Sequence, residues 1–204
     1  MKENLSEIVL IVDTSGSMHS LHNDTVGGIN SFIEVQKKEP GNAYVSIVLF
    51  NTQVNTLIES QQLDTVELLK KDSFADFGCT ALYDAVGYTI DNVGERLANL
   101  KEEERPSKVI IAILTDGFEN SSTKYDQKTV AEKIKHQREV YKWDFMFLAA
   151  NQDAWAGATM LNINPNLSFT YTADSAGVTR SYNAVSAATS SLRAGSENVS
   201  ISNN

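Results

Sequence analysis

Oxygen-bearing side chains follow one strongly apolar segment at every second position. Residues 8–12 are all aliphatic, and they are followed by Asp13, Ser15 and Ser17. One carboxylate and two hydroxyls offer only oxygen donors, which suit hard cations such as Mg²⁺, Mn²⁺ or Ca²⁺, whereas Zn²⁺ prefers Cys and His. The pattern therefore indicates a divalent-cation site. Taken alone, it is equally typical of a polar turn in which Ser17 begins a helix.

A second apolar segment delivers a second carboxylate in the same way. Residues 109–114 are aliphatic and lead directly into Thr115, Asp116 and Gly117. Uninterrupted aliphatic runs are typical of strands covered on both faces of a parallel sheet. Since ligands of such sheets bind at the carboxyl ends of the strands, Asp13 and Asp116 are expected at one rim. Two carboxylates held close together are costly unless a cation or a proton lies between them.

A third polar position lies in the segment 76–80, Asp-Phe-Gly-Cys-Thr, which is predicted to be a loop. A strongly periodic helix carrying Leu82, Val86 and Ile90 follows it, and this helix is predicted to begin at or beside Thr80. The most common role of a threonine in such a place is to cap the helix with its hydroxyl.

The elements that must position these side chains alternate along the chain. Further strands are predicted at 43–50, 54–59, 144–150 and 167–171, and the first two form an antiparallel hairpin because only three residues join them. Further helices are predicted after Ser17 to about 38, and at 127–141, 154–161 and 174–193. Residues 63–70 are either a short helix or an extended piece. The predicted fold is α/β: a doubly wound, mostly parallel central sheet with one antiparallel edge strand and helices on both faces.

The first predicted helix contains the pair Gly27-Gly28. Two glycines inside a helix cost about 2 kcal/mol relative to alanine. Either the helix approaches the sheet closely near the site, or its first turn is weak, and the pattern does not separate these alternatives.

Composition narrows the class of protein. The chain has 204 residues, 42% of them hydrophobic, which suits one large domain, predicted at 1–194, with a flexible tail at 195–204. A net charge of −9 argues against nucleic-acid and anionic membrane partners.

Cys79 is the only cysteine, so no internal disulfide is possible, which is compatible with a reducing compartment. The first residues do not resemble a signal peptide and no stretch resembles a transmembrane helix, so we expect a soluble, cytoplasmic monomer.

Three separated pieces of the chain, in order, resemble the von Willebrand factor A domain, also called the integrin I-like domain, over roughly residues 6–193. The segment 13–17 stands where the family has Asp-x-Ser-x-Ser, Thr80 where it has a lone loop threonine, and Asp116 where it has its distal aspartate. Together these pieces resemble a complete metal-ion-dependent adhesion site. Its five metal positions are Asp13, Ser15, Ser17, Thr80 and Asp116.

The resemblance implies a role for each position. Ser15 and Ser17 would bind the cation directly, Asp13 and Asp116 mostly through water, and Thr80 directly once a partner is engaged. Mg²⁺ or Mn²⁺ is expected, and Ca²⁺ is less favoured. Neutral hydroxyl ligands leave such a cation short of negative charge, so an Asp or Glu of a partner protein can complete its coordination. Cys79 stands where the family often has a second small glycine, and we expect it to be a small packing residue.

Two enzyme classes are weaker alternatives. A strand ending in an aspartate also resembles the haloacid-dehalogenase-like Mg²⁺-dependent phosphatases, but Ser15 stands where that family has its second acid. A serine hydrolase would need a histidine in a suitable context, and we expect the three histidines, His19, His22 and His136, to be surface helix residues. A structural subunit with a vestigial site is disfavoured because all five metal positions are filled.

The sequence thus predicts a metal-dependent protein-interaction module without catalytic activity. Bacterial stress-response, chelatase-associated and phage proteins use such domains, and the sequence does not select among them.

Overall fold

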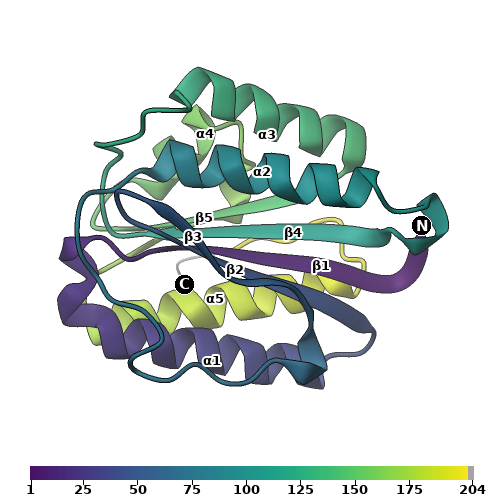
Figure 1. Cartoon of the computed structure of the whole chain (residues 1–204), viewed down its shortest axis with the longest axis horizontal. Helices are drawn as coiled ribbons and strands as arrows, with labels where there is room; N and C mark the ends of the chain where they lie inside the picture. Colours follow the sequence, from purple (N-terminus) through teal and green to yellow (C-terminus); the bar gives the residue numbers. More distant parts are fainter. Residues whose placement is uncertain (202–204) are drawn as a thin grey trace.

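The computed structural model describes residues 1–201 as a six-stranded sheet with helices on both faces (Figure 1). The strands are β1 (Lys2–Asp13), β2 (Asn42–Phe50), β3 (Val54–Gln62), β4 (Pro106–Thr115), β5 (Asp144–Ala150) and β6 (Ser168–Tyr171). The α-helices are α1 (His22–Lys38), α2 (Leu82–Ala98), α3 (Gln127–Tyr141), α4 (Ala154–Met160) and α5 (Ser175–Arg193). Short 3-10 helices are η1 (Gly16–Leu21), η2 (Leu63–Thr65), η3 (Glu102–Glu104) and η4 (Pro165–Leu167).

The strand order is β3-β2-β1-β4-β5-β6, with β1 near the centre. Every neighbouring pair is parallel except β2 and β3, which form the antiparallel hairpin at one edge. Helices α2 and α3 cover one face of the sheet, and α1 and α5 cover the other (Figure 1). The fold class predicted from the sequence is therefore confirmed.

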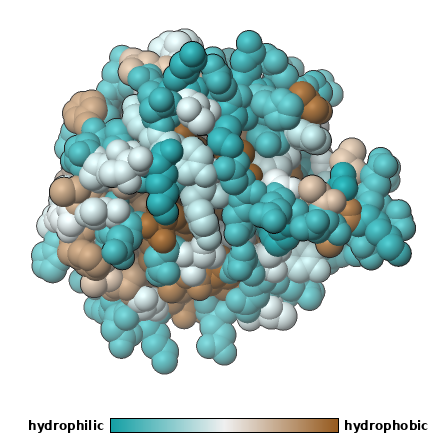
Figure 2. All heavy atoms as spheres, turned by 45° about the horizontal axis from the view of Figure 1, so that its top comes forward, coloured by the Kyte–Doolittle hydropathy of each residue, from teal (hydrophilic) through white to brown (hydrophobic). Residues whose placement is uncertain are grey.

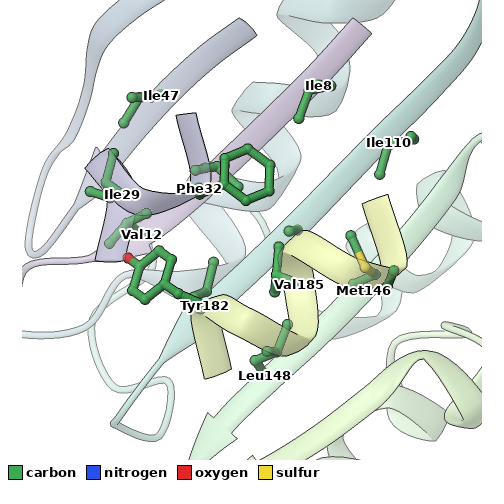
Figure 3. Packing of buried hydrophobic residues seen from close by; sticks show 14 of the residues in the cluster. Ile8, Val12, Ile29, Phe32, Ile47, Ile110, Met146, Leu148, Tyr182 and Val185 are labelled. Atoms are coloured by element: carbon green, nitrogen blue, oxygen red, sulfur yellow. The ribbon is translucent and has the colours of Figure 1, made fainter. Parts of the chain in front are cut away.

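The aliphatic run of β1 is buried on both faces of the sheet. Val9 and Ile11 belong to the core cluster that includes side chains of α2 and α3. Ile8, Leu10 and Val12 belong to the cluster with α1 and α5, part of which Figure 3 shows. A central strand between two helical layers has no solvent-facing side, which explains why its sequence does not alternate between apolar and polar residues.

Residues 63–70 form a short helix only over their first three positions, and the rest is neither helix nor strand. Leu63–Thr65 is a single 3-10 turn, and residues 66–81 form a long loop with no helix or strand. The backbone of this loop is fastened by side chains instead, since Asn30 of α1 accepts a hydrogen bond from Leu69 N (2.7 Å) and donates one to Leu69 O (2.9 Å). Lys37 Nζ donates to Val66 O (2.7 Å).

The glycine pair in α1 marks a close approach between two helices. A Cβ atom at Gly28 would lie 2.2 Å from the ring of Tyr182, which belongs to α5. Gly27 is exposed, and a Cβ there would meet nothing within 4 Å. The close approach expected from the sequence is therefore present at Gly28, but its partner is α5 rather than the sheet.

Alanine at these two neighbouring positions is expected to have opposite effects on stability. Gly28→Ala should lower the free energy of unfolding by about 1–3 kcal/mol, because the added methyl group forces α1 and α5 apart. Gly27→Ala should raise it by roughly 0.5–1 kcal/mol, because alanine reduces the entropy lost on forming an exposed helix. Urea unfolding of both variants measures this difference, and equal shifts would contradict the assigned contact.

Part of the segment predicted to be a flexible tail is packed on the domain. Ile201 is buried, and its backbone N–H donates to Asn166 O (2.8 Å). The rest of that predicted tail, 202–204, lies outside the described residues. Among the described residues, no helix has the length and apolar character needed to cross a membrane.

Candidate metal centre

Strands β1 and β4 bring the two predicted aspartates to one edge of the sheet. Val12 pairs with Leu114 in the parallel register, so Asp13 at the end of β1 lies opposite Thr115, and Asp116 follows one position further along. This edge lies at the left of Figure 1, on the side away from the N-terminus. The juxtaposition follows from strand order, because β1 and β4 are immediate neighbours.

A continuous hydrogen-bond chain joins four of the predicted residues. Asp13 Oδ1 accepts from Ser15 N (2.8 Å), and Ser15 Oγ lies 3.2 Å from Ser17 Oγ. Ser17 Oγ donates to Asp116 Oδ1 (2.8 Å). The other Asp13 oxygen, Oδ2, accepts from Thr115 Oγ1 (2.6 Å), so this fully buried carboxylate is held from both sides. The arrangement orients the Ser15 backbone and keeps both serine hydroxyls beside Asp116.

Thr80 completes the group from the other side. A Cβ at Gly117, the residue after Asp116, would lie 3.1 Å from Thr80 Oγ1. The backbone of Thr80 is fixed by Asn120, whose Oδ1 accepts from Thr80 N (2.9 Å) and whose N donates to Thr80 O (3.1 Å). Within residues 1–201, the Thr80 hydroxyl has no hydrogen-bond partner from the protein. The buried side chain thus offers an oxygen donor beside Gly117, the residue that follows Asp116.

The helix-capping role is wrong for this threonine. Helix α2 begins at Leu82 with Ala81 as its N-cap, and no side chain at that position caps it. The caps come instead from the loop after β4: Tyr83 N donates to Glu119 Oε2 (2.9 Å), and Asp84 N donates to Ser122 Oγ (3.0 Å). Since the helix is capped from a distant segment, the Thr80 hydroxyl is left for another use.

Asp84 of α2 in turn holds the loop after β4 through its carboxylate. Its carboxylate accepts hydrogen bonds from three consecutive backbone N–H groups, at 2.9 Å from Thr123 and 2.8 Å from both Lys124 and Tyr125. Burial raises the pKa of Asp84, but these three donors outweigh it and hold the pKa below its usual value. The start of α2 and the loop after Asp116 therefore lock together, which fixes Thr80 relative to Asp116.

Sequence reasoning missed the supporting residues Asp84, Glu119 and Asn120. The polar run from Glu119 to Ser122 is a signal for capping side chains, because such residues favour helix ends and turns. The sequence does not show which helix they cap.

Burial raises the pKa of both central carboxyl groups. For Asp13, burial is the largest cause; hydrogen bonds from Thr115 and Ser15 oppose it, and the negative charge of Asp116 adds to it. For Asp116, burial again dominates, Ser17 opposes it, and Asp76 raises the pKa further. Ionised carboxylates here lack compensating charge, which a divalent cation would supply.

The donor set fits a hard cation. Within residues 1–201, no group of three or more His, Cys, Asp or Glu side chains could hold a metal ion. A cation at this edge would therefore depend on the three hydroxyls of Ser15, Ser17 and Thr80 together with the two carboxylates. Hydroxyl and carboxylate oxygens are donors that Mg²⁺ and Mn²⁺ accept readily.

Cys79 is not the packing residue predicted from the sequence. Its side chain is exposed, and only its backbone is held, through a hydrogen bond from Cys79 N to Thr52 Oγ1 (2.9 Å). The adjacent Gly78 has φ of +75°, a conformation that favours glycine, so the loop turns there and directs the next side chain outward.

His22 is also not the surface residue expected, whereas His19 and His136 are exposed. Its Nδ1 lies 2.5 Å from Asp76 Oδ2, and its Nε2 donates to Lys71 O (2.6 Å). The Asp76 side chain is 1% exposed. This pair fastens the long 66–81 loop to the start of α1, on the same side as Ser17.

The family model of the von Willebrand factor type A domain matches residues 7–184 of the sequence. No curated protein sequence matches the chain.

Solved structures with a similar fold come from distant organisms. Proximal thread matrix protein 1 from the mussel byssus is 13% identical, with a TM-score of 0.64, over 91% of this chain and 46% of that one. The same mussel protein has also been solved with a zinc-occupied MIDAS motif, with a TM-score of 0.61. The ArnB paralog VWA2 from Sulfolobus acidocaldarius is 16% identical, with a TM-score of 0.57, over 92% of this chain and 45% of that one.

The pilus adhesin SpaC from Lactobacillus rhamnosus GG is 10% identical, with a TM-score of 0.63, over 92% of this chain and 30% of that one. At such identities the likeness concerns the fold alone. The chain spans less than half the length of each of these proteins.

Proposed function

The chain belongs to the von Willebrand factor type A domain family, and from this premise we propose that it binds an acidic side chain of a partner protein through a divalent cation. Domains of this family typically are metal-dependent protein-interaction modules. The observation that carries the proposal is the buried Thr80 hydroxyl, which lies against Gly117, the residue after Asp116, without a hydrogen-bond partner within residues 1–201.

In the proposed site, Ser15 and Ser17 bind the cation through their hydroxyls, and Asp13 and Asp116 act mostly through water. Thr80 joins when a partner is engaged. Mg²⁺ or Mn²⁺ is the favoured ion and Ca²⁺ is less favoured, although the mussel relative holds zinc in its corresponding motif. A cation held largely by neutral hydroxyls keeps enough positive charge to attract a carboxylate from outside.

Because the chain is negatively charged, an acidic partner needs the cation in order to bind. The chain carries a net charge of −9, so it would repel an acidic segment unless a bound ion supplied local attraction. Binding should therefore depend on the metal more strongly than on any single protein side chain outside the site.

The phosphatase alternative is less well supported by the same geometry. A nucleophilic aspartate must reach its substrate, yet Asp13 is fully buried and both of its oxygens accept hydrogen bonds. The position two residues later, where a second acid would be needed, is Ser15, whose hydroxyl contacts Ser17. We therefore propose a role without catalysis.

Thr80→Ala is expected to weaken metal-dependent partner binding by about tenfold or more, because one ligand of the partner-engaged cation is lost. The fold should persist, since Thr80 is anchored to Asn120 through its backbone. The test is affinity capture from native lysate in Mg²⁺ or chelator, with mass spectrometry of the bound proteins.

Thr80→Ser keeps the hydroxyl and serves as the matched control that should retain capture. Partner binding that survives both chelator and Thr80→Ala would place the interface elsewhere. Metal-dependent hydrolysis of a phosphate ester, lost in Asp13→Asn, would favour the phosphatase instead.

A further inference from the structure

An apolar groove opens beside the candidate metal centre. It has a volume of about 340 Å³ and lies between the loop after β4, the first turn of α2, and α4. Its walls include apolar side chains and one glycine: Leu82, Tyr83, Gly117, Phe118, Phe147 and Met160. Concave apolar surfaces of this kind are typical places for a partner side chain to bind.

The groove and the metal centre share one peptide segment. Gly117 lines the groove and directly follows Asp116, and the position of its missing Cβ lies 3.1 Å from Thr80 Oγ1. The Gly117 carbonyl accepts from Gln152 Nε2 (3.0 Å), and Gly117 N donates to Thr115 Oγ1 (3.2 Å), so this wall is held firmly. A partner that reaches the cation would therefore also lie over the mouth of the groove.

Large apolar side chains are exposed around this mouth. Phe118 is 73% exposed and Met160 is 57% exposed, and both line the groove. Figure 2 shows apolar surface gathered at the left of the molecule, the side on which the strands end in Figure 1. Exposed aromatic and Met side chains beside a pocket are typical of protein interfaces.

Charge restricts what the groove can accept. The charged residues that line it are Glu119 and Asp153, and both are already used: Glu119 caps α2 at Tyr83 N, and Asp153 caps α4 at Ala156 N (3.0 Å). A second acidic side chain of the partner would be repelled here. An apolar side chain avoids that repulsion and gains from burial.

We propose that the partner segment whose Asp or Glu binds the cation also inserts a large apolar side chain, such as Leu, Met, Phe or Trp, into this groove. The inference rests on the proposed metal-dependent function. Since Asp116 and Gly117 are consecutive, the acid and the apolar residue lie within about three positions of each other in an extended segment, at roughly 3.3–3.6 Å per residue.

A random peptide library displayed on phage and selected on the full chain in Mg²⁺ tests both the metal-dependent binding and the insertion of an apolar side chain into the groove. The expected result is enrichment of peptides that carry Asp or Glu with a large apolar residue within three positions, and that are released by chelator. Phe118→Ser combined with Met160→Ser should weaken these peptides about tenfold or more, because two exposed walls of the groove are lost. Calorimetric Mg²⁺ affinity should stay unchanged in that variant.

Val140→Ser combined with Tyr141→Ser is the matched control, because both side chains are apolar and exposed on α3, outside the groove. It should leave peptide affinity within twofold. Enrichment of acidic peptides without an apolar neighbour, or full affinity in the groove variant, would overturn the groove while leaving the metal-dependent function intact. Failure to enrich any chelator-sensitive acidic peptide would instead overturn the proposed function, and the groove proposal with it.

Discussion

Asp13→Ala is expected to abolish saturable Mg²⁺ or Mn²⁺ binding in a calorimetric titration of chelator-treated protein. The substitution removes a buried negative charge and also the two contacts that orient Ser15 and Thr115. Outer-shell partners of a metal commonly contribute about 10- to 100-fold in affinity, and a group that also positions a direct ligand belongs at the upper end. The loss of metal affinity should therefore be about a hundredfold.

Thermal unfolding gives an independent measurement of the same effect. A cation that binds the native state raises the melting temperature of the wild-type protein, and it should not do so for Asp13→Ala. Asp72→Ala is the matched control, because it removes one carboxylate from an exposed part of the 66–81 loop and makes the same change in net charge. Heat and melting temperature that respond to metal equally in both variants would refute the assigned centre.

Arg96→Ala is expected to produce a large loss of stability for a substitution of a partly exposed residue outside the site. Arg96 of α2 forms a two-pronged contact with Glu7 of β1, at 2.8 Å from Nη2 to Oε1 and 3.3 Å from Nη1 to Oε2. The Glu7 side chain is 1% exposed, and Ser46 Oγ donates to it weakly (3.4 Å). Removing one partner of a buried pair leaves an uncompensated charge and costs about 3–5 kcal/mol.

We expect the lower end of that range, about 3 kcal/mol at pH 7, because the Arg96 side chain is 25% exposed and water can partly replace it. For a domain of this size, the melting temperature should fall by roughly 6–12 °C. Lys135→Ala breaks an exposed pair with Glu139 and is the control, with an expected change below about 0.5 kcal/mol.

The stability lost in Arg96→Ala should depend on pH in a defined direction. Burial raises the pKa of Glu7 above its ordinary value of 4.5, and Arg96 opposes this, so the pKa should rise further in Arg96→Ala. A carboxyl whose pKa is higher in the folded state favours folding while protonated, and that advantage disappears as pH rises through the folded pKa. The deficit of Arg96→Ala relative to wild type should therefore shrink as pH is lowered from 7 toward 5.

Adding Glu7→Gln to Arg96→Ala removes the buried charge altogether. This double variant should regain stability at pH 7 and lose the pH dependence of the deficit. A deficit in Arg96→Ala that does not change between pH 5 and 7 would show that lost packing, and not the charge of Glu7, is the cause.

The amino-acid sequence by itself determines the central strands and the chemistry at their ends. Residues 8–12 and 109–114 are aliphatic without interruption, and such a run is stable only where both faces of a strand are covered. That condition implies a parallel sheet between helices, whose carboxyl ends share an edge, so the proximity of Asp13 and Asp116 could be inferred without coordinates. The preference for a hard cation follows from the oxygen donors alone.

Only the tertiary structure excluded the helix-capping role of Thr80. Within the local sequence its hydroxyl has one obvious use, as a helix cap, because Thr80 stands just before a strongly periodic helix. The structure removes that use, since Glu119 and Ser122, 36 and 38 positions away from their partners, supply the caps of α2. Within residues 1–201, a Thr80 hydroxyl without a hydrogen-bond partner beside Gly117 results from how two loops meet.

Contacts between distant segments also explain the other differences between the sequence-based predictions and the structure. The contact of His22 with Asp76 and the contact of Gly28 with Tyr182 both join residues far apart in the chain. Propensity and periodicity describe interactions within a few residues, and they carry no information on which distant segment lies across an edge or a helix face. Strand ends could therefore be located from the sequence, whereas the contacts that hold the loops of the candidate centre together could be located only from the fold.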